Sequence, residues 1–107
     1  MELAISESPG LMVVRVLEPR IDAASAIQFK DRMRSLAAAG HDRLMLDLSQ
    51  VGFLDSSGLG AMIAVRKALP ETLPLVLDGL TPNVERVFRL TRMDSVFEIR
   101  PATTPQE

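Results

Sequence analysis

Short apolar runs alternate with longer amphipathic segments along the 107 residues, and this alternation constrains the fold more than any other feature. Four runs have the composition of buried strands: residues 11–18, 44–48, 73–78 and 96–99. Three segments have the periodicity of helices: residues 23–39, residues 57–69 and the stretch that follows Pro82. A chain that alternates in this way favours a mostly parallel or mixed sheet with crossover helices.

The first strand-like run has a shorter partner at residues 3–6, and Ser8, Pro9 and Gly10 between them predict a turn. The two runs therefore predict an antiparallel hairpin at the start of the chain. The whole order is β-β-α-β-α-β-α-β. We expect one α/β domain over residues 1–100, with a mixed sheet of four to five strands and three to four helices, followed by a polar tail at 101–107.

Helix boundaries are marked by capping residues. Asp22 is the predicted N-cap of the first helix, and Gly40 is its predicted C-terminal stop. Thr81 is the predicted N-cap of the last helix, with Pro82 at its first position.

Composition narrows the class of protein. The formal net charge is −2, which disfavours nucleic acid as the main partner, and the lack of cysteine excludes a disulfide framework. The longest apolar runs fall short of the roughly 20 residues needed to span a bilayer. The first ten residues do not resemble a signal peptide. We expect a cytoplasmic protein with no membrane segment.

The stretch FLDSSGLG, residues 53–60, gathers an acid, two hydroxyls and two glycines. It lacks the G-x-S-x-G pattern of a nucleophile elbow and the lysine of a phosphate-binding loop. His41 is the only histidine, and the acids do not form a tight cluster. We therefore expect no enzyme activity, no cofactor and no metal.

The position of Ser56 and Ser57 at a predicted helix start allows two roles for their hydroxyls. Ser56 or Ser57 can cap the helix that starts here. A helix start also tolerates an anion, so a phosphorylated serine fits this position. Gly58 and Gly60 serve either close packing between helix and strand or the close approach of another protein.

The helix that follows has no charged residue between Leu59 and Val65. Such a helix is either buried or covered by a partner. Leu59 and Met62 are candidates for an exposed contact patch, and the alternative is that they belong to the core.

Three segments together resemble the STAS-domain anti-sigma factor antagonist family. The first is LMLDLSQVGFLDSSGLGAMIAVRKAL, residues 44–69, in which Asp-Ser-Ser-Gly-Leu-Gly opens a helix. Residues 19–33 are similar to the family's Gly-x-Leu-Asp segment, although Pro19-Arg20-Ile21-Asp22 lacks the glycine. Residues 81–99 are similar to its Ser-Pro-x-Val-x-Arg-x-Phe ending, although residues 91–94 lack the common Gly-Leu pair.

The resemblance implies a STAS fold and a switch in binding partners. Such antagonists, when unphosphorylated, bind an anti-sigma factor that is also a serine kinase with a histidine-kinase-like ATPase fold. Phosphorylation releases the partner, and a serine phosphatase reverses it. The resemblance places the phosphate on Ser56, with Ser57 as second choice. The resemblance and the local residue pattern together assign partner binding to seven positions: Asp22, Asp55, Ser57, Gly58, Leu59, Gly60 and Met62.

Other functions remain open at this point. A STAS subunit of a lipid or anion transport complex would dock on an ATPase, and phosphorylation would not be its purpose. Transport relatives often lack the serine pair, so Ser56 and Ser57 favour the switch. A small nucleotide-binding enzyme is the third class. We expect a monomer or a weak dimer.

Overall fold

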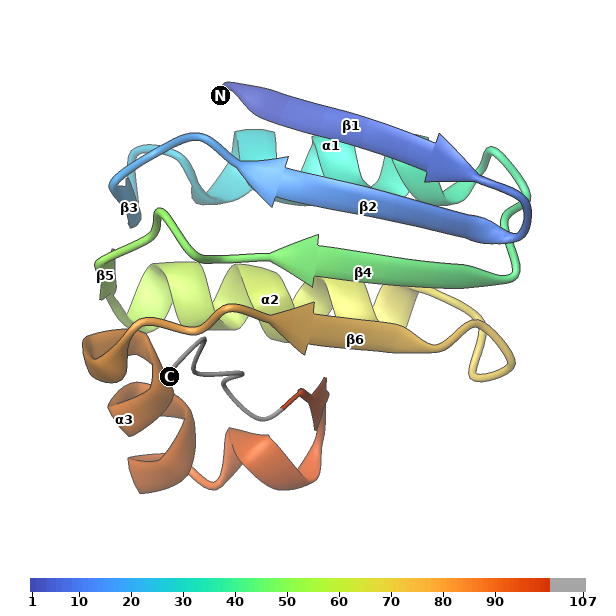
Figure 1. Ribbon diagram of the computed structural model, residues 1–107. Helices are drawn as coiled ribbons and strands as arrows, with labels where there is room; N and C mark the ends of the chain where they lie inside the picture. The colour runs from blue at the N-terminus through green and yellow to red at the C-terminus, as the bar shows by residue number, and fades with distance from the viewer. Residues whose placement is uncertain (101–107) are drawn as a thin grey trace, which may run out of the picture.

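Five strands form the central sheet of the structure, a computed structural model that describes residues 1–100; the predicted tail lies outside the described residues (Figure 1). Their spatial order is β1-β2-β4-β6-β7. The strands have these bounds: β1 Leu3–Ser8, β2 Leu11–Val16, β4 Arg43–Asp47, β6 Leu75–Asp78 and β7 Glu98–Ile99. β1 pairs antiparallel with β2, and every other pair in the sheet is parallel.

The predicted hairpin and the mixed sheet are therefore confirmed. Gly10 has a φ of 76°, a left-handed value that favours glycine, and it closes the tight turn between β1 and β2. β1 is longer than predicted, because its pairing with β2 continues to the register pair Ser8 and Leu11.

Three α-helices follow strands in the predicted order: α1 Ala26–Ala37, α2 Ser56–Ala68 and α3 Pro82–Leu90. A 3₁₀-helix, η1 Met93–Ser95, follows α3. α1 and α2 pack against each other on the same face of the sheet, and α3 lies on the side of the sheet that ends in β6 and β7 (Figure 1). Thr81 is the N-cap residue of α3 and Pro82 is its first residue, as predicted. The Thr81 hydroxyl makes no capping hydrogen bond and instead donates to the Val51 carbonyl at 2.7 Å.

The core lies between the sheet and the helices. Alternate residues of β2 point into it, and Met12, Val14 and Val16 are buried. Phe29 and Met33 bury the inner face of α1. Phe88 of α3 packs on Phe97 with ring centroids 5.6 Å apart, which closes the core beside β6.

Among residues 1–100, no helix lies over β1, β2 and β4 on the opposite face of the sheet (Figure 1). Two ion pairs lie here instead. Arg15 Nε donates to Asp47 Oδ2 at 3.0 Å, and Arg100 Nε lies 3.6 Å from Asp78 Oδ1. Asp47 and Asp78 are register neighbours on β4 and β6, so each arginine offsets the repulsion between two adjacent carboxylates.

Candidate functional site

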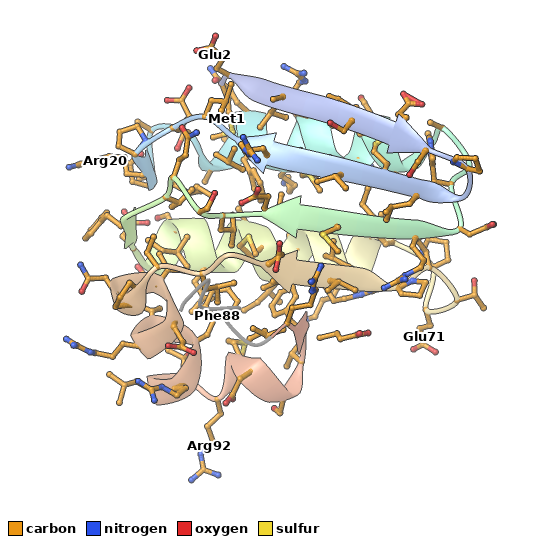
Figure 2. The ribbon with its side chains drawn as sticks, viewed as in Figure 1. Met1, Glu2, Arg20, Glu71, Phe88 and Arg92 are labelled. Carbon is orange, nitrogen blue, oxygen red and sulfur yellow. The ribbon has the colours of Figure 1, made fainter. Side chains whose placement is uncertain are left out.

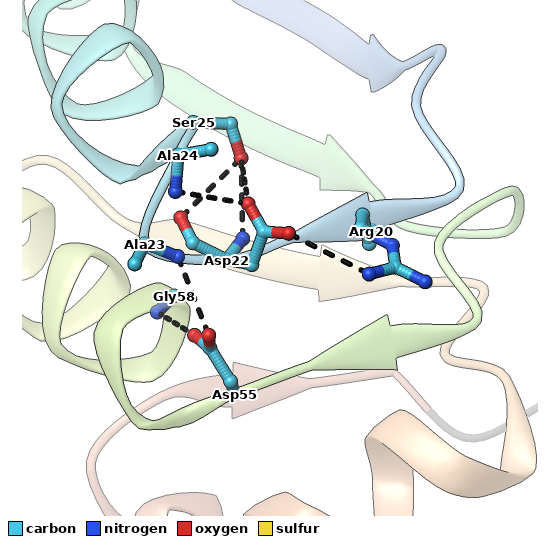
Figure 3. Close-up of polar contacts among 7 residues, drawn as sticks. All are labelled: Arg20, Asp22, Ala23, Ala24, Ser25, Asp55 and Gly58. Carbon is cyan, nitrogen blue, oxygen red and sulfur yellow. Dashed lines mark hydrogen bonds and ion pairs between the residues drawn. The ribbon is translucent and has the colours of Figure 1, made fainter.

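A second, very short sheet brings the starts of α1 and α2 together. It consists of β3 (Arg20–Ile21) and β5 (Phe53–Leu54), which pair in parallel beyond the carboxyl ends of β2 and β4. Because each helix begins soon after one of these strands, residues 22–25 and 55–58 meet at one corner of the molecule (Figure 3). We call residues 20–25 and 53–60 the switch corner.

Asp55 is the N-cap of α2 and joins the two halves of the switch corner. Its Oδ1 accepts the Gly58 backbone N–H at 2.8 Å, and its Oδ2 accepts the Ala23 N–H at 3.3 Å (Figure 3). One carboxylate thus satisfies a donor at the helix start and another in the loop before α1. The prediction that Ser56 or Ser57 caps α2 is wrong, because the helix already begins at Ser56 and the residue before it, Asp55, has the extended backbone of an N-cap and accepts the Gly58 N–H.

Asp22 forms a tight turn ahead of α1 rather than its cap. Its Oδ1 accepts the Ala24 N–H at 3.1 Å and the Ser25 hydroxyl at 3.3 Å, while Ser25 Oγ accepts the Asp22 N–H at 3.1 Å. The N-cap of α1 is Ser25, and the helix begins at Ala26. The predicted cap at Asp22 is therefore about one turn too early in the chain. Its carboxylate accepts an N–H of the turn that precedes α1 and not an N–H of the helix itself.

Arg20 lies at the rim of the switch corner. Its guanidinium stands 5.3 Å from the centroid of the Phe53 ring, and its Nη1 lies 3.8 Å from Asp22 Oδ2 (Figure 3). The Phe53 side chain is half exposed. Arg20 and Phe53 were not predicted as site residues, although the aromatic residue directly before Leu54-Asp55 is visible in the sequence.

Ser56 and Ser57 occupy the first turn of α2, and both are exposed. Neither hydroxyl takes part in any side-chain hydrogen bond among residues 1–100. Both oxygens are therefore accessible from solvent at the positive end of the α2 dipole. The structure leaves the hydroxyls open to modification and gives the capping role to Asp55.

The two glycines of the motif have different surroundings. A Cβ on Gly58 would overlap the Ile21 carbonyl oxygen and press on Leu54 Cδ1, so Gly58 permits α2 to pass close to β3. Nothing lies within 4 Å of a Cβ built on Gly60, which is exposed. Gly58 therefore serves close packing, and Gly60 faces open space.

Leu59 and Met62 are buried, at 9% and 1% exposure, so the expected exposed patch at these residues is wrong. The sheet and α1 enclose most of α2, and both side chains join the core cluster. Of the other candidate partner-binding residues, Asp22 and Asp55 are half-buried, Ser57 and Gly60 are exposed, and Gly58 is buried.

A shallow groove between α1 and α2 provides an exposed apolar surface beside Ser57. Its walls come from both helices: Ala26, Ile27, Lys30, Ser57, Gly60, Ala61 and Ala64. Ile27 is 69% exposed. Ala26, Phe29 and Met33 follow one another at spacings of three and four, and Ile27 does not share this spacing, so the mismatch could have identified it from sequence.

Two other titratable residues lie away from the switch corner. Burial pushes the pKa of Asp47 upward, but hydrogen bonds from Ser49 and the charge of Arg15 outweigh burial and lower this pKa below its usual value. His41 lies just before β4, at the end of the sheet opposite the switch corner, and its Nε2 is 3.3 Å from Glu7 Oε2. The structure therefore does not bring His41 to Asp55 and the serines.

Within residues 1–100, no helix is both long enough and apolar enough to cross a membrane. The same part of the chain holds no group of three or more acidic or histidine side chains placed to bind a metal ion.

The fold and the Asp-Ser-Ser-Gly corner define a STAS domain. A family model for the STAS domain matches residues 2–104, and the chain belongs to this family. The STAS fold predicted from the sequence is thereby confirmed.

Three known proteins illustrate the similarity. The anti-sigma-B factor antagonist of Listeria monocytogenes is 32% identical over 81 residues, which cover 75% of this chain and 71% of the relative. BtrV of Bordetella bronchiseptica is 29% identical over 100 residues, covering 92% and 85%. The crystal structure of an anti-sigma factor antagonist from Mycobacterium paratuberculosis has a TM-score of 0.84 and 27% identity, covering 94% and 86%.

Proposed function

We propose that this chain is an anti-sigma factor antagonist that acts as a phosphorylation switch and performs no catalysis itself. In its unphosphorylated form it binds an anti-sigma factor that is also a serine kinase, and phosphorylation of Ser56 releases that partner. A serine phosphatase restores binding. The names of the relatives support the role of antagonist. One observation on this chain carries the proposal: the Ser56 hydroxyl is exposed and unbonded at the first residue of α2.

The electrostatics of the switch corner support a change in binding rather than in fold. A phosphate on Ser56 adds about −1.5 to −2 charge at neutral pH. The start of α2 offsets part of this charge, while Asp55 beside it adds to the negative field. Both oxygens of Asp55 are already engaged by backbone N–H groups, so the carboxylate holds the helix start in place. A partner seated on this corner would meet two adjacent negative groups, which costs several kcal/mol if its own surface is acidic or apolar.

The partner surface we propose combines the predicted partner-binding positions that are accessible with the groove between α1 and α2. Asp22, Asp55, Ser57 and Gly60 supply the polar and small residues. Ile27 supplies apolar contact area beside them. Gly58, Leu59 and Met62 support the shape of this surface from below.

The test is intact mass and peptide mapping after incubation with ATP and the histidine-kinase-like serine kinase encoded nearest to this chain. We expect one phosphate on the peptide that contains Asp55 to Gly60. Ser56→Ala should lose the phosphate and keep partner binding, Ser56→Asp should weaken binding, and Ser57→Ala is the matched control that keeps both. Full phosphorylation of Ser56→Ala would show that the serine is wrongly assigned.

A protein that takes up no phosphate and copurifies with a transporter ATPase would instead be a transport subunit. In that case the Ser56 hydroxyl would have no switching role, and the proposed function would be wrong.

A further inference from the structure

The C-terminal end of α3 combines backbone strain with exposed charge. Arg92 stands just after the C-cap Thr91 and has a φ of 60°, the only positive φ of a non-glycine residue among residues 1–100. In this left-handed region the Cβ of an L-residue crowds a backbone carbonyl, whereas glycine does not suffer this contact. Glycine is therefore the usual residue at this position after a helix. An arginine here carries a cost that a function of its side chain would explain.

Three neighbouring side chains extend this charged surface. Arg86, Arg89 and Leu90 are spaced i, i+3 and i+4 on α3, so they share one side of the helix. All are exposed, and Leu90, at 77%, is the most exposed large apolar side chain of the described residues. Figure 2 shows Arg92 projecting away from the body of the molecule. We call Arg86, Arg89, Leu90 and Arg92 the α3 patch.

The charges of the α3 patch have no partner in the described part of the chain. None of the ion pairs among residues 1–100 includes Arg86, Arg89 or Arg92. Segment 82–95 holds these three arginines against two acids, Glu85 and Asp94, in a chain whose net charge is −2. The patch is thus locally basic on an acidic protein, and an exposed leucine lies within it.

We infer that the α3 patch is a second docking surface for the anti-sigma partner, which presents an acidic segment with one apolar side chain against Leu90. This inference rests on the proposed function. α3 packs against β5 at the switch corner, so a partner seated on Ser56 can continue along the helix to the patch (Figure 1). Arginine is enriched at protein interfaces, where its fork-shaped donor group pairs with two carboxylate oxygens.

The mixed charge of the α3 patch and its exposed leucine favour an acidic protein over nucleic acid as the partner. Phosphate backbones reward a continuous basic surface, but Glu85 and Asp94 interrupt this one. Leu90 gains nothing from a phosphate backbone, whereas an apolar side chain of a protein partner would remove it from water.

The decisive variant is Arg92→Gly, because it removes the charge and also relieves the left-handed strain. We expect its melting temperature to equal or exceed that of the wild type. The affinity of the unphosphorylated variant for the kinase should fall about threefold to tenfold. Leu90→Ala should weaken binding by a similar factor. Arg34→Ala on α1 is the matched control, since Arg34 is also exposed, and it should bind as the wild type does.

Binding is measured by isothermal titration of the purified kinase at several salt concentrations. The affinity of the wild type should fall more steeply with salt than that of Arg92→Gly, because one charged contact is missing in the variant. If the wild type binds and Arg92→Gly and Leu90→Ala bind equally well, the α3 patch is no interface, although the proposed function stands.

Two further outcomes would also overturn the inference about the α3 patch. A wild type that does not bind the kinase overturns the proposed function and this inference with it. If short duplex DNA binds the wild type, and Arg92→Gly abolishes this binding but leaves the affinity for the kinase unchanged, the α3 patch is a nucleic-acid surface and the inference is wrong.

Discussion

Gly58 and Gly60 lie two residues apart on α2, and alanine at these positions should change stability in opposite directions. Both substitutions replace glycine within a helix, which favours folding by up to about 1 kcal/mol. At Gly60 nothing opposes this gain, because the new Cβ meets open space. At Gly58 the new Cβ would overlap the Ile21 carbonyl oxygen, which is backbone and cannot rotate away.

The magnitude at Gly58 follows from the competing contributions. Forcing an extra carbon into a packed site typically costs about 1 to 3 kcal/mol, and the helix propensity returns up to about 1. Because the new Cβ would meet backbone as well as the Leu54 side chain, we place the cost in the upper part of this range, at about 2 to 3 kcal/mol, and expect Gly58→Ala to lower the free energy of unfolding by roughly 1 to 2 kcal/mol. Gly60→Ala should raise it by up to about 1 kcal/mol.

The assay is urea unfolding followed by circular dichroism, with both variants and the wild type in the same buffer. The slope of the free energy against urea should stay constant, so that the shift in midpoint reports stability alone. If Gly58→Ala unfolds at the same urea concentration as the wild type or above it, then α2 does not pass as close to β3 as the structure shows. The reasoning on this contact would then be refuted.

Three more predictions concern residues around the core and the switch corner. Leu59→Lys should unfold the domain or abolish its cooperative transition, because it buries a charge; a folded Leu59→Lys that has only lost partner binding would contradict this. Asp55→Ala should lower the free energy of unfolding by about 1 kcal/mol or more, measured in urea, since two N–H groups lose their acceptor. The lowered pKa of Asp47 stabilises the fold above about pH 4, and this contribution is lost as pH falls through the pKa of the folded state. The urea midpoint of Asp47→Asn should therefore change less between pH 6 and pH 3 than that of the wild type, and equal changes would argue against the Asp47 contacts.

The order of the main strands and helices was predictable because most of these elements have a clear period or clear boundary residues. Residues 44–48 alternate in the way a strand requires, and Thr81-Pro82 marks the start of α3. The hairpin followed from the turn residues around Gly10. What the sequence did not reveal was the β3–β5 pair, because two residues are too few to show a period.

The candidate site was predictable as a location but not in its internal contacts. Asp55, Ser56 and Ser57 were selected together, yet which of the three caps α2 depends on the path of the backbone. Gly58 and Gly60 look equivalent in the sequence, and only the approach of β3 separates them.

Burial on α2 was ambiguous for a related reason. A helix that is apolar on all sides gives no periodic signal for its inner face. Leu59 and Met62 are buried because α1 packs beside α2, and that arrangement involves residues far apart in the chain. Arg92 shows the opposite case: the sequence gives no sign of its left-handed backbone, which only the structure reveals.

The spatial order of the sheet repeats the order in which the chain is synthesised. β2 pairs with β1, β4 with β2, β6 with β4, and β7 with β6, so each new strand of this sheet adds beside the preceding one. A nascent chain can therefore pair every strand as it leaves the ribosome, without waiting for a later segment to insert between two earlier ones. Residues 82–99 emerge after β6 and bring Phe88 and Phe97 over the core beside it. Until they arrive, β6 is an open edge next to uncovered apolar side chains, and the sheet depends on this later segment to close that edge.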